Sequence, residues 1–193
     1  MILVIDTSGT HWTVAVVDSA GQGRVLAEST DRPKLSEVYK EVEKLTKVAV
    51  ATGPGSFTGL RVGVSFGLGL AMGLRIPIIP LPSLDLRAAR SDTPVTAVLE
   101  AGRGRVYYQL PGGKPALGEP ASVPASHPLV GDIAPKTAAA LIAAGHSFVA
   151  TRGLHDFATA AQRALKTARE VAYGSLEIEY MQSFSIPTKA SKK

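Results

Sequence analysis

The chain has 193 residues, of which 45% are hydrophobic, and a net charge of +5, which is enough apolar material for one large core or two smaller lobes. It contains no cysteine, and this excludes disulfide bonds, thiolate metal sites and cysteine nucleophiles. Neither a run of about 20 apolar residues nor a secretory signal is recognisable, so we expect a cytoplasmic protein that does not enter a membrane.

The first half of the chain predicts a mixed α/β lobe. Alternating apolar residues indicate three strands joined by short glycine turns, and the following segments alternate between helix and strand. The expected strands cover residues 1–6, 11–18, 24–30, 48–52 and 76–79, and the expected helices cover 33–45, 58–73 and 83–89. The helix over 33–45 is amphipathic, with Leu35, Val38, Tyr39 and Val42 on its apolar face.

The helix expected over 58–73 carries glycines at every fourth position, namely Gly59, Gly63 and Gly67. Each glycine inside a helix costs about 1 kcal/mol relative to alanine, so the pattern needs a compensating interaction. Such a ridge allows another backbone to approach closely. Because the helix is apolar nearly all round, two alternatives remain: it is enclosed within its own domain, or one of its sides packs on another subunit.

A glycine-rich loop, residues 53–56, connects the preceding strand to this helix. It lacks the Lys and Ser/Thr of a phosphate-binding P-loop, and it does not match the glycine spacing of a dinucleotide fingerprint. The loop either binds an anion through free N–H groups at the helix N-terminus or serves only to place the helix, for which Thr58 is the expected N-cap.

A second, smaller lobe is expected over residues 93–185, with the first lobe over 1–92 and a basic tail over 186–193. The expected strands here cover 95–99, 105–110, 129–133, 147–151 and 176–181, and the expected helices cover 135–144 and 154–168. The tail contains three lysines, and removing them from the net charge of +5 leaves +2 for the rest of the chain. We expect the tail to be a disordered, solvated end, with electrostatic contact to RNA as the alternative.

Few residues have the spacing of a catalytic or metal site. No two of the four histidines stand three to five residues apart, so no zinc site is predicted. The first strand ends in the run Asp6, Thr7, Ser8, Gly9. An aspartate in this position either presents its carboxylate and the N–H groups of the turn to a metal-bound phosphate or simply forms a turn.

A basic and aromatic group occurs in the second lobe. It consists of Arg103, Arg105, Tyr107 and Tyr108. The group either contacts RNA, since bases stack on aromatic side chains, or reflects the two alternating faces of a strand.

Three segments together resemble the bacterial TsaB (YeaZ) proteins: MILVIDTSG at 1–9, VAVATGPGSFTGLRVG at 48–63 and GRGRVYY at 102–108. The resemblance covers residues 1 to about 110. It implies an α/β protein with the two-lobed actin-like ATPase fold, also described as ribonuclease H-like. The expected lobes have mixed sheets flanked by helices, and the second lobe is reduced.

The resemblance implies a non-catalytic scaffold subunit of the complex that forms N6-threonylcarbamoyladenosine at position 37 of tRNAs reading ANN codons. In that complex the subunit binds and activates its paralogue TsaD, which uses a metal held by an HxxxH motif. This chain has no HxxxH motif. We therefore expect no catalytic residues, no metal and no cofactor, apart from weak ATP or ADP binding that is shared with the partner. Asp6, Thr7, Ser8 and Gly9 would be the degenerate phosphate loop.

The resemblance also implies an interface, with TsaD or with a second copy in a homodimer, made by helices 34–45 and 58–73. The residues carried over to this interface are Leu35, Val38, Tyr39, Val42, Gly59, Leu60, Gly63, Val64, Gly67 and Leu70. The ATPase TsaE is expected to join the complex, and tRNA is expected to be reached only through it. Two other functions remain open: an independent ATP-binding phosphotransferase that uses the Asp6 loop, and a direct RNA-binding protein that uses the tail and Arg103.

Overall fold

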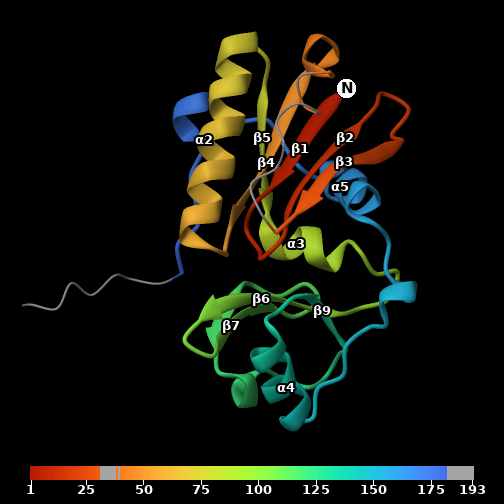
Figure 1. The fold of residues 1–193 in the computed structure, drawn as a ribbon, viewed down its shortest axis with the longest axis vertical. Helices are drawn as coiled ribbons and strands as arrows, with labels where there is room; N and C mark the ends of the chain where they lie inside the picture. Colours follow the sequence, from red (N-terminus) through yellow and green to blue (C-terminus); the bar gives the residue numbers. More distant parts are fainter. Residues whose placement is uncertain (31–37, 39, 182–193) are drawn as a thin grey trace, which may run out of the picture.

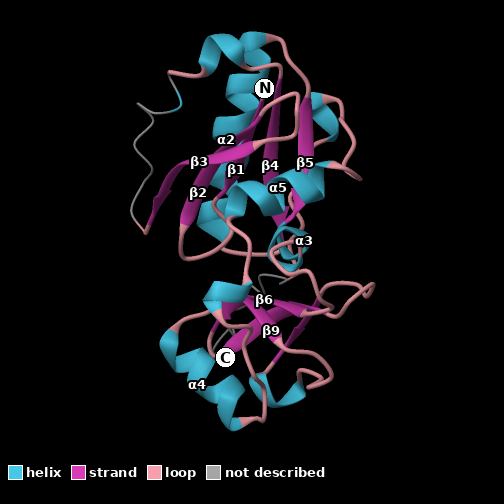
Figure 2. Ribbon diagram, turned by 90° about the vertical axis from the view of Figure 1, so that its right-hand side faces the viewer, coloured by secondary structure: helices cyan, strands magenta, loops and turns pink. Residues whose placement is uncertain are grey.

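The computed structural model describes residues 1–30, 38 and 40–181, which form two lobes, each built on a β-sheet (Figures 1 and 2). The first sheet has five strands in the order β3-β2-β1-β4-β5. They are β1 (Ile2–Asp6), β2 (Trp12–Val17), β3 (Gly23–Ser29), β4 (Lys47–Gly53) and β5 (Ile78–Pro82). β1, β4 and β5 are parallel, and β2 and β3 are antiparallel additions at one side. The five strands expected in this lobe are confirmed, with ends shifted by one to three residues.

Of the described helices, α2 and α5 cover the first sheet, one on each face (Figure 1). Helix α2 (Phe57–Leu74) packs on the face to which Leu3 and Ile5 of β1 point. Helix α5 (Phe157–Leu165) packs on the other face, to which Val4 points. Because both faces are covered, β1 is apolar at consecutive positions and not only at alternate ones.

The second lobe repeats the arrangement of the first in a reduced form. Its sheet has the order β8-β7-β6-β9, in which β7 and β8 are antiparallel additions and β9 runs parallel to β6. The strands are β6 (Thr96–Gly102), β7 (Arg105–Gln109), β8 (Ala116–Gly118) and β9 (Leu129–Asp132), with a 3₁₀ turn at Pro120–Ser122. Helix α4 (Pro135–Ala143) follows β9 as α2 follows β4. It lies on the face of the sheet that is remote from the first lobe (Figure 1).

A short helix, α3 (Ser83–Ala88), lies between the two lobes (Figure 1). Its Leu84 belongs to an apolar cluster with Leu99 and Tyr107 of the second sheet, and its Leu86 belongs to the cluster beneath α5. Because Leu84 and Leu86 point to opposite sides of the helix, α3 joins the two cores.

The predicted second lobe, residues 93–185, is too long. α5 and the segment after it return to the first lobe, where the Val171 N–H donates to the Ile78 carbonyl at 3.0 Å. Leu176 and Ile178 then pack against the core on the α2 side of the first sheet. The physical reason is that the second face of the first sheet is apolar and needs a covering helix, which the described part of residues 1–92 does not supply.

Three further elements differ from the sequence-based expectation. Residues 147–151 form no strand: Phe148 makes a single bridge to Leu129, and a 3₁₀ turn follows at Thr151–Gly153. Residues 176–181 follow the 3₁₀ turn Tyr173–Ser175 and also form no strand. Their apolar side chains Leu176 and Ile178 pack against the core of the first lobe, and the backbone does not join a sheet. Helix α5 begins three residues later than expected because the Asp156 carboxylate caps its first turn by accepting a hydrogen bond from the Thr159 N–H at 2.8 Å, and it ends at Leu165, three residues earlier than expected.

The helix expected over 33–45 falls largely outside the described residues, and so do Leu35, Tyr39 and the tail 186–193. Val38 is described and is only 3% exposed. Val42 begins a 3₁₀ turn (Val42–Lys44) and is partly buried. Both side chains pack against the core of the first lobe. This differs from the prediction, in which Val38 and Val42 face a partner.

Candidate functional site

Helix α2 starts directly after the glycine-rich loop that follows β4. Ser56 is its N-cap, with the Ser56 hydroxyl accepting a hydrogen bond from the Gly59 N–H at 3.2 Å. The sequence-based choice of Thr58 was therefore two residues late. The helix ends at Arg75, which adopts the left-handed conformation at φ +56° and returns its N–H to carbonyls of the last turn.

The glycine ridge of α2 faces the chain's own sheet. A Cβ on Gly59 would lie 2.0 Å from the Thr7 carbonyl oxygen, and a Cβ on Gly63 would lie 2.2 Å from Thr7 Oγ1. A Cβ on Gly67 would lie 2.3 Å from a methyl carbon of Val50. The Thr7 hydroxyl uses this proximity to donate a hydrogen bond to the Gly59 carbonyl at 2.7 Å. The glycines therefore allow α2 to approach β1 and β4 closely, which is the compensating interaction that the sequence required.

This orientation corrects the predicted interface. Five of the residues assigned to it are buried within the chain, namely Gly59, Leu60, Gly63, Val64 and Gly67. Leu70 is half-buried against the same core. The pattern correctly indicated a close approach, but the approaching backbone belongs to the first lobe and not to a partner.

The opposite side of α2 is open. We call it the outer face, and it consists of Thr58, Val62, Ser65, Gly69, Met72 and Gly73. Val62 and Met72 are 41% and 53% exposed, and a Cβ on Gly69 or Gly73 would meet nothing within 4 Å. The outer face has no charged side chain, although the exposed Arg61 lies beside it. It is thus a second ridge of small and apolar residues, and no described part of the chain covers it.

Among the described residues, α2 is the one helix whose length and composition would allow it to cross a membrane. One third of its 18-residue window is buried inside the molecule. The face of α2 that carries the glycine ridge packs on β1 and β4. Much of the apolar composition of the helix is therefore explained by its contribution to the core.

The carboxylate of Asp6 is committed to contacts within the chain. One of its oxygens accepts hydrogen bonds from the Ser8 N–H at 2.8 Å and from the Ser8 hydroxyl at 2.6 Å. The other oxygen pairs with Arg87 Nη1, and Asp6 is only 1% exposed. The carboxylate is therefore not presented to a metal-bound phosphate, and of the two alternatives for the Asp6 loop the structure shows the turn.

Arg87 carries a buried charge between two aspartates. Its Nη2 lies 3.1 Å from Asp132 Oδ2, while its Nη1 pairs with Asp6. Burial alone would lower the pKa of Arg87, but the charges of Asp6 and Asp132 outweigh burial and raise the pKa. The two aspartates therefore stabilise the charged form of the guanidinium.

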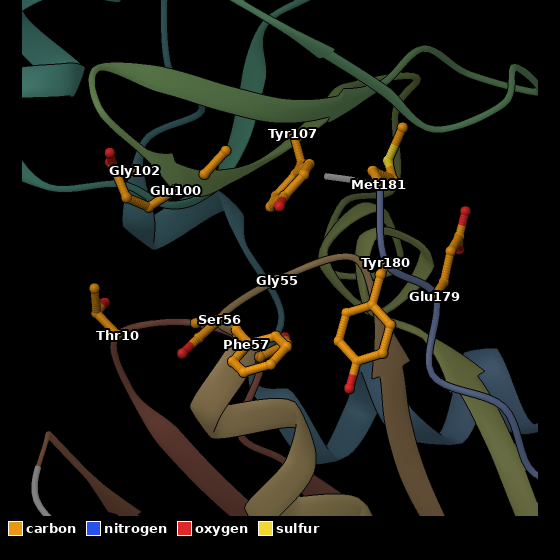
Figure 3. Close-up of a pocket in the computed structure, with 13 residues that line it drawn as sticks. Thr10, Gly55, Ser56, Phe57, Glu100, Gly102, Tyr107, Glu179, Tyr180 and Met181 are labelled. Atoms are coloured by element: carbon orange, nitrogen blue, oxygen red, sulfur yellow. The ribbon is translucent and has the colours of Figure 1, made fainter. Parts of the chain in front are cut away.

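A cleft of about 430 Å³ lies between the lobes, above the Asp6 loop and the start of α2 (Figure 3). Tyr107 points into it from the second lobe, toward the side that carries Phe57 and Tyr180 (Figure 3). The described residues that line it include Glu100 and Glu179, and none of them is Lys, Arg or His. The Glu100 carboxylate accepts hydrogen bonds from the Ala134 N–H at 3.2 Å and from the Thr137 hydroxyl at 3.0 Å, at the start of α4. A polyphosphate in this cleft would thus find no cationic partner among the described side chains.

The last described residues form one wall of the cleft, although their sequence predicts a strand. The Glu179 N–H donates to the Thr52 carbonyl at 2.8 Å. Arg61 donates to the Tyr180 hydroxyl at 3.0 Å and stacks over the Phe57 ring at 3.8 Å. The wall was missed because an alternating apolar pattern predicts a strand, whereas this segment is held by apolar packing, by the Glu179 hydrogen bond to β4 and by Arg61.

The group at Arg103 does not form one surface. Tyr107 is buried in the cleft-facing side of the second sheet, and Tyr108 is half-buried against the core on the opposite side. Arg103 is exposed in the β6–β7 turn. The alternating faces of β7 explain the pattern. Among the described residues, no group of three or more His, Asp or Glu side chains is placed to hold a metal ion.

Comparison with known proteins places the chain in a family. Residues 32–172 match the family model of TsaD, tRNA N6-adenosine threonylcarbamoyltransferase. The protein named tRNA threonylcarbamoyladenosine biosynthesis protein TsaB of Bacillus subtilis is 42% identical over 71 residues, which are 35% of this chain and 31% of that protein. The protein of the same name from Haemophilus influenzae is 29% identical over 122 residues, which are 55% of this chain and 52% of that protein. The chain thus spans about half or less of the length of these relatives.

Solved structures agree on the fold. A Pseudomonas aeruginosa protein described as similar to peptidase YEAZ superposes with a TM-score of 0.66 and 18% identity over 94% of this chain and 99% of its own. YeaZ from Pseudomonas aeruginosa superposes with a TM-score of 0.52 and 22% identity over 64% of this chain and 69% of its own. The two mixed sheets with their flanking helices are the actin-like, ribonuclease H-like fold. From the matched model, the relatives and the fold, the chain belongs to the TsaD family of tRNA N6-adenosine threonylcarbamoyltransferases, and within it to the TsaB (YeaZ) proteins.

Proposed function

We propose that this chain is a non-catalytic scaffold subunit in the formation of N6-threonylcarbamoyladenosine in tRNAs that read ANN codons, and that it binds and activates TsaD. The names of its relatives support the pathway. The observation that carries the binding role is the outer face of α2, which is apolar, lined by small residues and not covered by any described residue. Its position on the rigid sheet of the first lobe suits a permanent docking surface.

The outer face has the features that a helix of a partner requires. Exposed Val62 and Met72 supply apolar area, and Gly69 and Gly73 leave room for a second helix to lie close to the α2 backbone. Apolar side chains gathered on one exposed face mark protein interaction sites more often than isolated ones do. In the absence of TsaD, the same face would pair two copies of this chain.

The non-catalytic role is supported by how the polar groups are used. Asp6 is paired with Arg87 and hydrogen-bonded to Ser8, and no described residue that lines the cleft above it is basic. We therefore propose that ATP is handled by the complex with TsaD and the ATPase TsaE, and that this chain needs no cofactor. It would meet tRNA through the same cytoplasmic complex.

Replacement of Gly69 by leucine tests the docking surface. The variant should remain folded and gain about 0.5–1 kcal/mol, because leucine is the better helix former and the added side chain meets no neighbour. Its affinity for TsaD should fall by roughly tenfold to a hundredfold, the effect of overfilling a close contact by about 1–3 kcal/mol. Sedimentation velocity of the chain with TsaD measures the binding.

Ala139→Leu is the matched control, since it adds the same side chain bulk to an exposed position of α4 on the far lobe. The control should bind TsaD like the parent chain and support the same rate of tRNA modification in a reconstituted reaction. Unaltered binding of TsaD by the folded Gly69→Leu chain would contradict the proposed surface.

The rival function, an independent ATP-using phosphotransferase, makes a different prediction. Because no described residue that lines the cleft is basic, titration calorimetry of the isolated chain with Mg-ATP should show no saturable binding at millimolar nucleotide. Saturable binding by this chain alone would favour the phosphotransferase. The measurement needs no variant, so it does not depend on disturbing the buried Asp6.

A further inference from the structure

Helix α3 provides polar contacts at the junction of the two lobes. On the rim of the junction, Gln109 Nε2 of β7 donates to Asp85 Oδ1 of α3 at 2.9 Å. In its interior, Arg87 of α3 binds Asp6 at the end of β1 and Asp132 at the end of β9. Asp6 belongs to the first sheet and Asp132 to the second. One guanidinium thus connects carboxylates at positions 6 and 132, which are 126 residues apart in sequence and lie on different lobes.

The interior contact is well shielded from water. The side chains of Arg87 and Asp6 are 4% and 1% exposed, and that of Asp132 is 23% exposed. Gly9 covers the pair so closely that a Cβ there would lie 3.0 Å from Arg87 Nη2 and 3.1 Å from Asp132 Oδ2. Gly9 itself lines the interlobe cleft, so the ion pair forms the layer directly beneath the floor of the cleft.

We infer that Asp6, Arg87 and Asp132 form an interlobe latch, which holds the two lobes in one orientation and the cleft at one width. Each carboxylate binds a different terminal nitrogen of the guanidinium, so the two ends of the latch can separate independently. A rotation that widens the cleft moves β9 away from β1 and must break the Arg87–Asp132 pair. The Asp132 carboxylate would then lose its partner of opposite charge, and the guanidinium would keep Asp6 alone in a site that holds little water.

A second contact spans the same gap and supports the inference. Residue Glu179 is hydrogen-bonded to β4 of the first lobe, and two residues later Met181 packs against the second-lobe cluster that includes Leu99 and Tyr107. The cleft is therefore bounded below by the latch and on one side by a segment attached to both lobes. A rigid cleft of this kind keeps the first and second lobes in a fixed relation while a partner binds α2. The latch concerns the chain alone, so it stands or falls independently of TsaD binding.

Distances between spin labels on the two lobes test the latch. The chain has no cysteine, so Ser19→Cys in the β2–β3 turn and Ala139→Cys on α4 provide two unique, exposed labelling sites. Double electron–electron resonance on the full chain should give one narrow distance distribution. Adding Asp132→Asn, which cuts only the arm to the second lobe, should broaden the distribution and add a population at longer distances. Arg87→Met should do so more strongly.

Glu41→Gln is the control, because it removes ion pairs with Arg24 and Lys44 that lie entirely within the first lobe. It should leave the distribution of the parent chain unchanged. If Arg87→Met does not fold, Asp132→Asn decides the question, since the Asp6–Arg87 pair remains in that variant. A folded Asp132→Asn chain with the narrow distribution of the parent would overturn the latch.

Discussion

Replacement of Gly63 by leucine is expected to destabilise the first lobe by about 3 kcal/mol or more. A Cβ at this position would lie 2.2 Å from Thr7 Oγ1, and the hydroxyl could no longer reach the Gly59 carbonyl. Because Thr7 is buried on the turn after β1, the added side chain has no route to solvent and must push α2 off the sheet. The midpoint of urea unfolding, followed by circular dichroism, measures the loss.

The comparison with Gly69→Leu makes this result decisive. Both variants put the same side chain on the same helix, but Gly63 faces β1 and Gly69 faces open space. We expect the first to unfold at much lower urea than the parent and the second to unfold at equal or higher urea. Equal midpoints for the two variants would mean that the inner and outer faces of α2 have been assigned incorrectly.

Replacement of Arg87 by methionine is expected to cost about 3–5 kcal/mol, the usual effect of removing one partner from a buried ion pair. Asp6, at 1% exposed, would keep its hydrogen bonds from Ser8 but lose the charge that balances its own. The free energy of unfolding at neutral pH, obtained from urea titration, measures the effect. Since folded proteins of this kind have roughly 5–15 kcal/mol in total, the variant should be marginal at body temperature.

A double variant separates charge from packing. Adding Asp6→Asn to Arg87→Met removes the stranded carboxylate, so part of the lost stability should return, and the two substitutions should be clearly non-additive. If Arg87→Met alone stays within about 1 kcal/mol of the parent, the ion pair is not a structural element of the junction.

The first lobe was largely predictable from the sequence, because its strands are short apolar runs that end in glycine turns. The same holds for α2, whose length and glycine spacing required a buried helix in close contact with another backbone. What the spacing could not reveal was the identity of that backbone. Thr7 is 52 residues from Gly59, and only the formed sheet brings the turn after β1 under the start of α2.

The interlobe residues were missed for a related reason. Arg87 occurs in a short segment with Asp85 and Arg90 nearby, a composition that is typical of a solvated helix face. Its burial arises because α3 is enclosed by both lobes, and its partners at positions 6 and 132 come from separate sheets. Sequence patterns do not predict contacts between residues that are so far apart in the chain. The packing of α5 and the following segment on the first lobe was not predicted either. Which face of the first sheet still needs a covering helix becomes apparent only in the folded structure.

Site-directed cross-linking from the outer face of α2 tests the central claim most directly. In the cysteine-free chain, a photoreactive group attached through Ser65→Cys lies in the middle of that face, and one attached through Ala139→Cys lies on the remote lobe. After mixing with TsaD and illumination, we predict a covalent product containing both proteins from position 65 and none from position 139. A product from position 139 alone, with none from position 65, would contradict the assignment of α2 as the surface on which TsaD assembles.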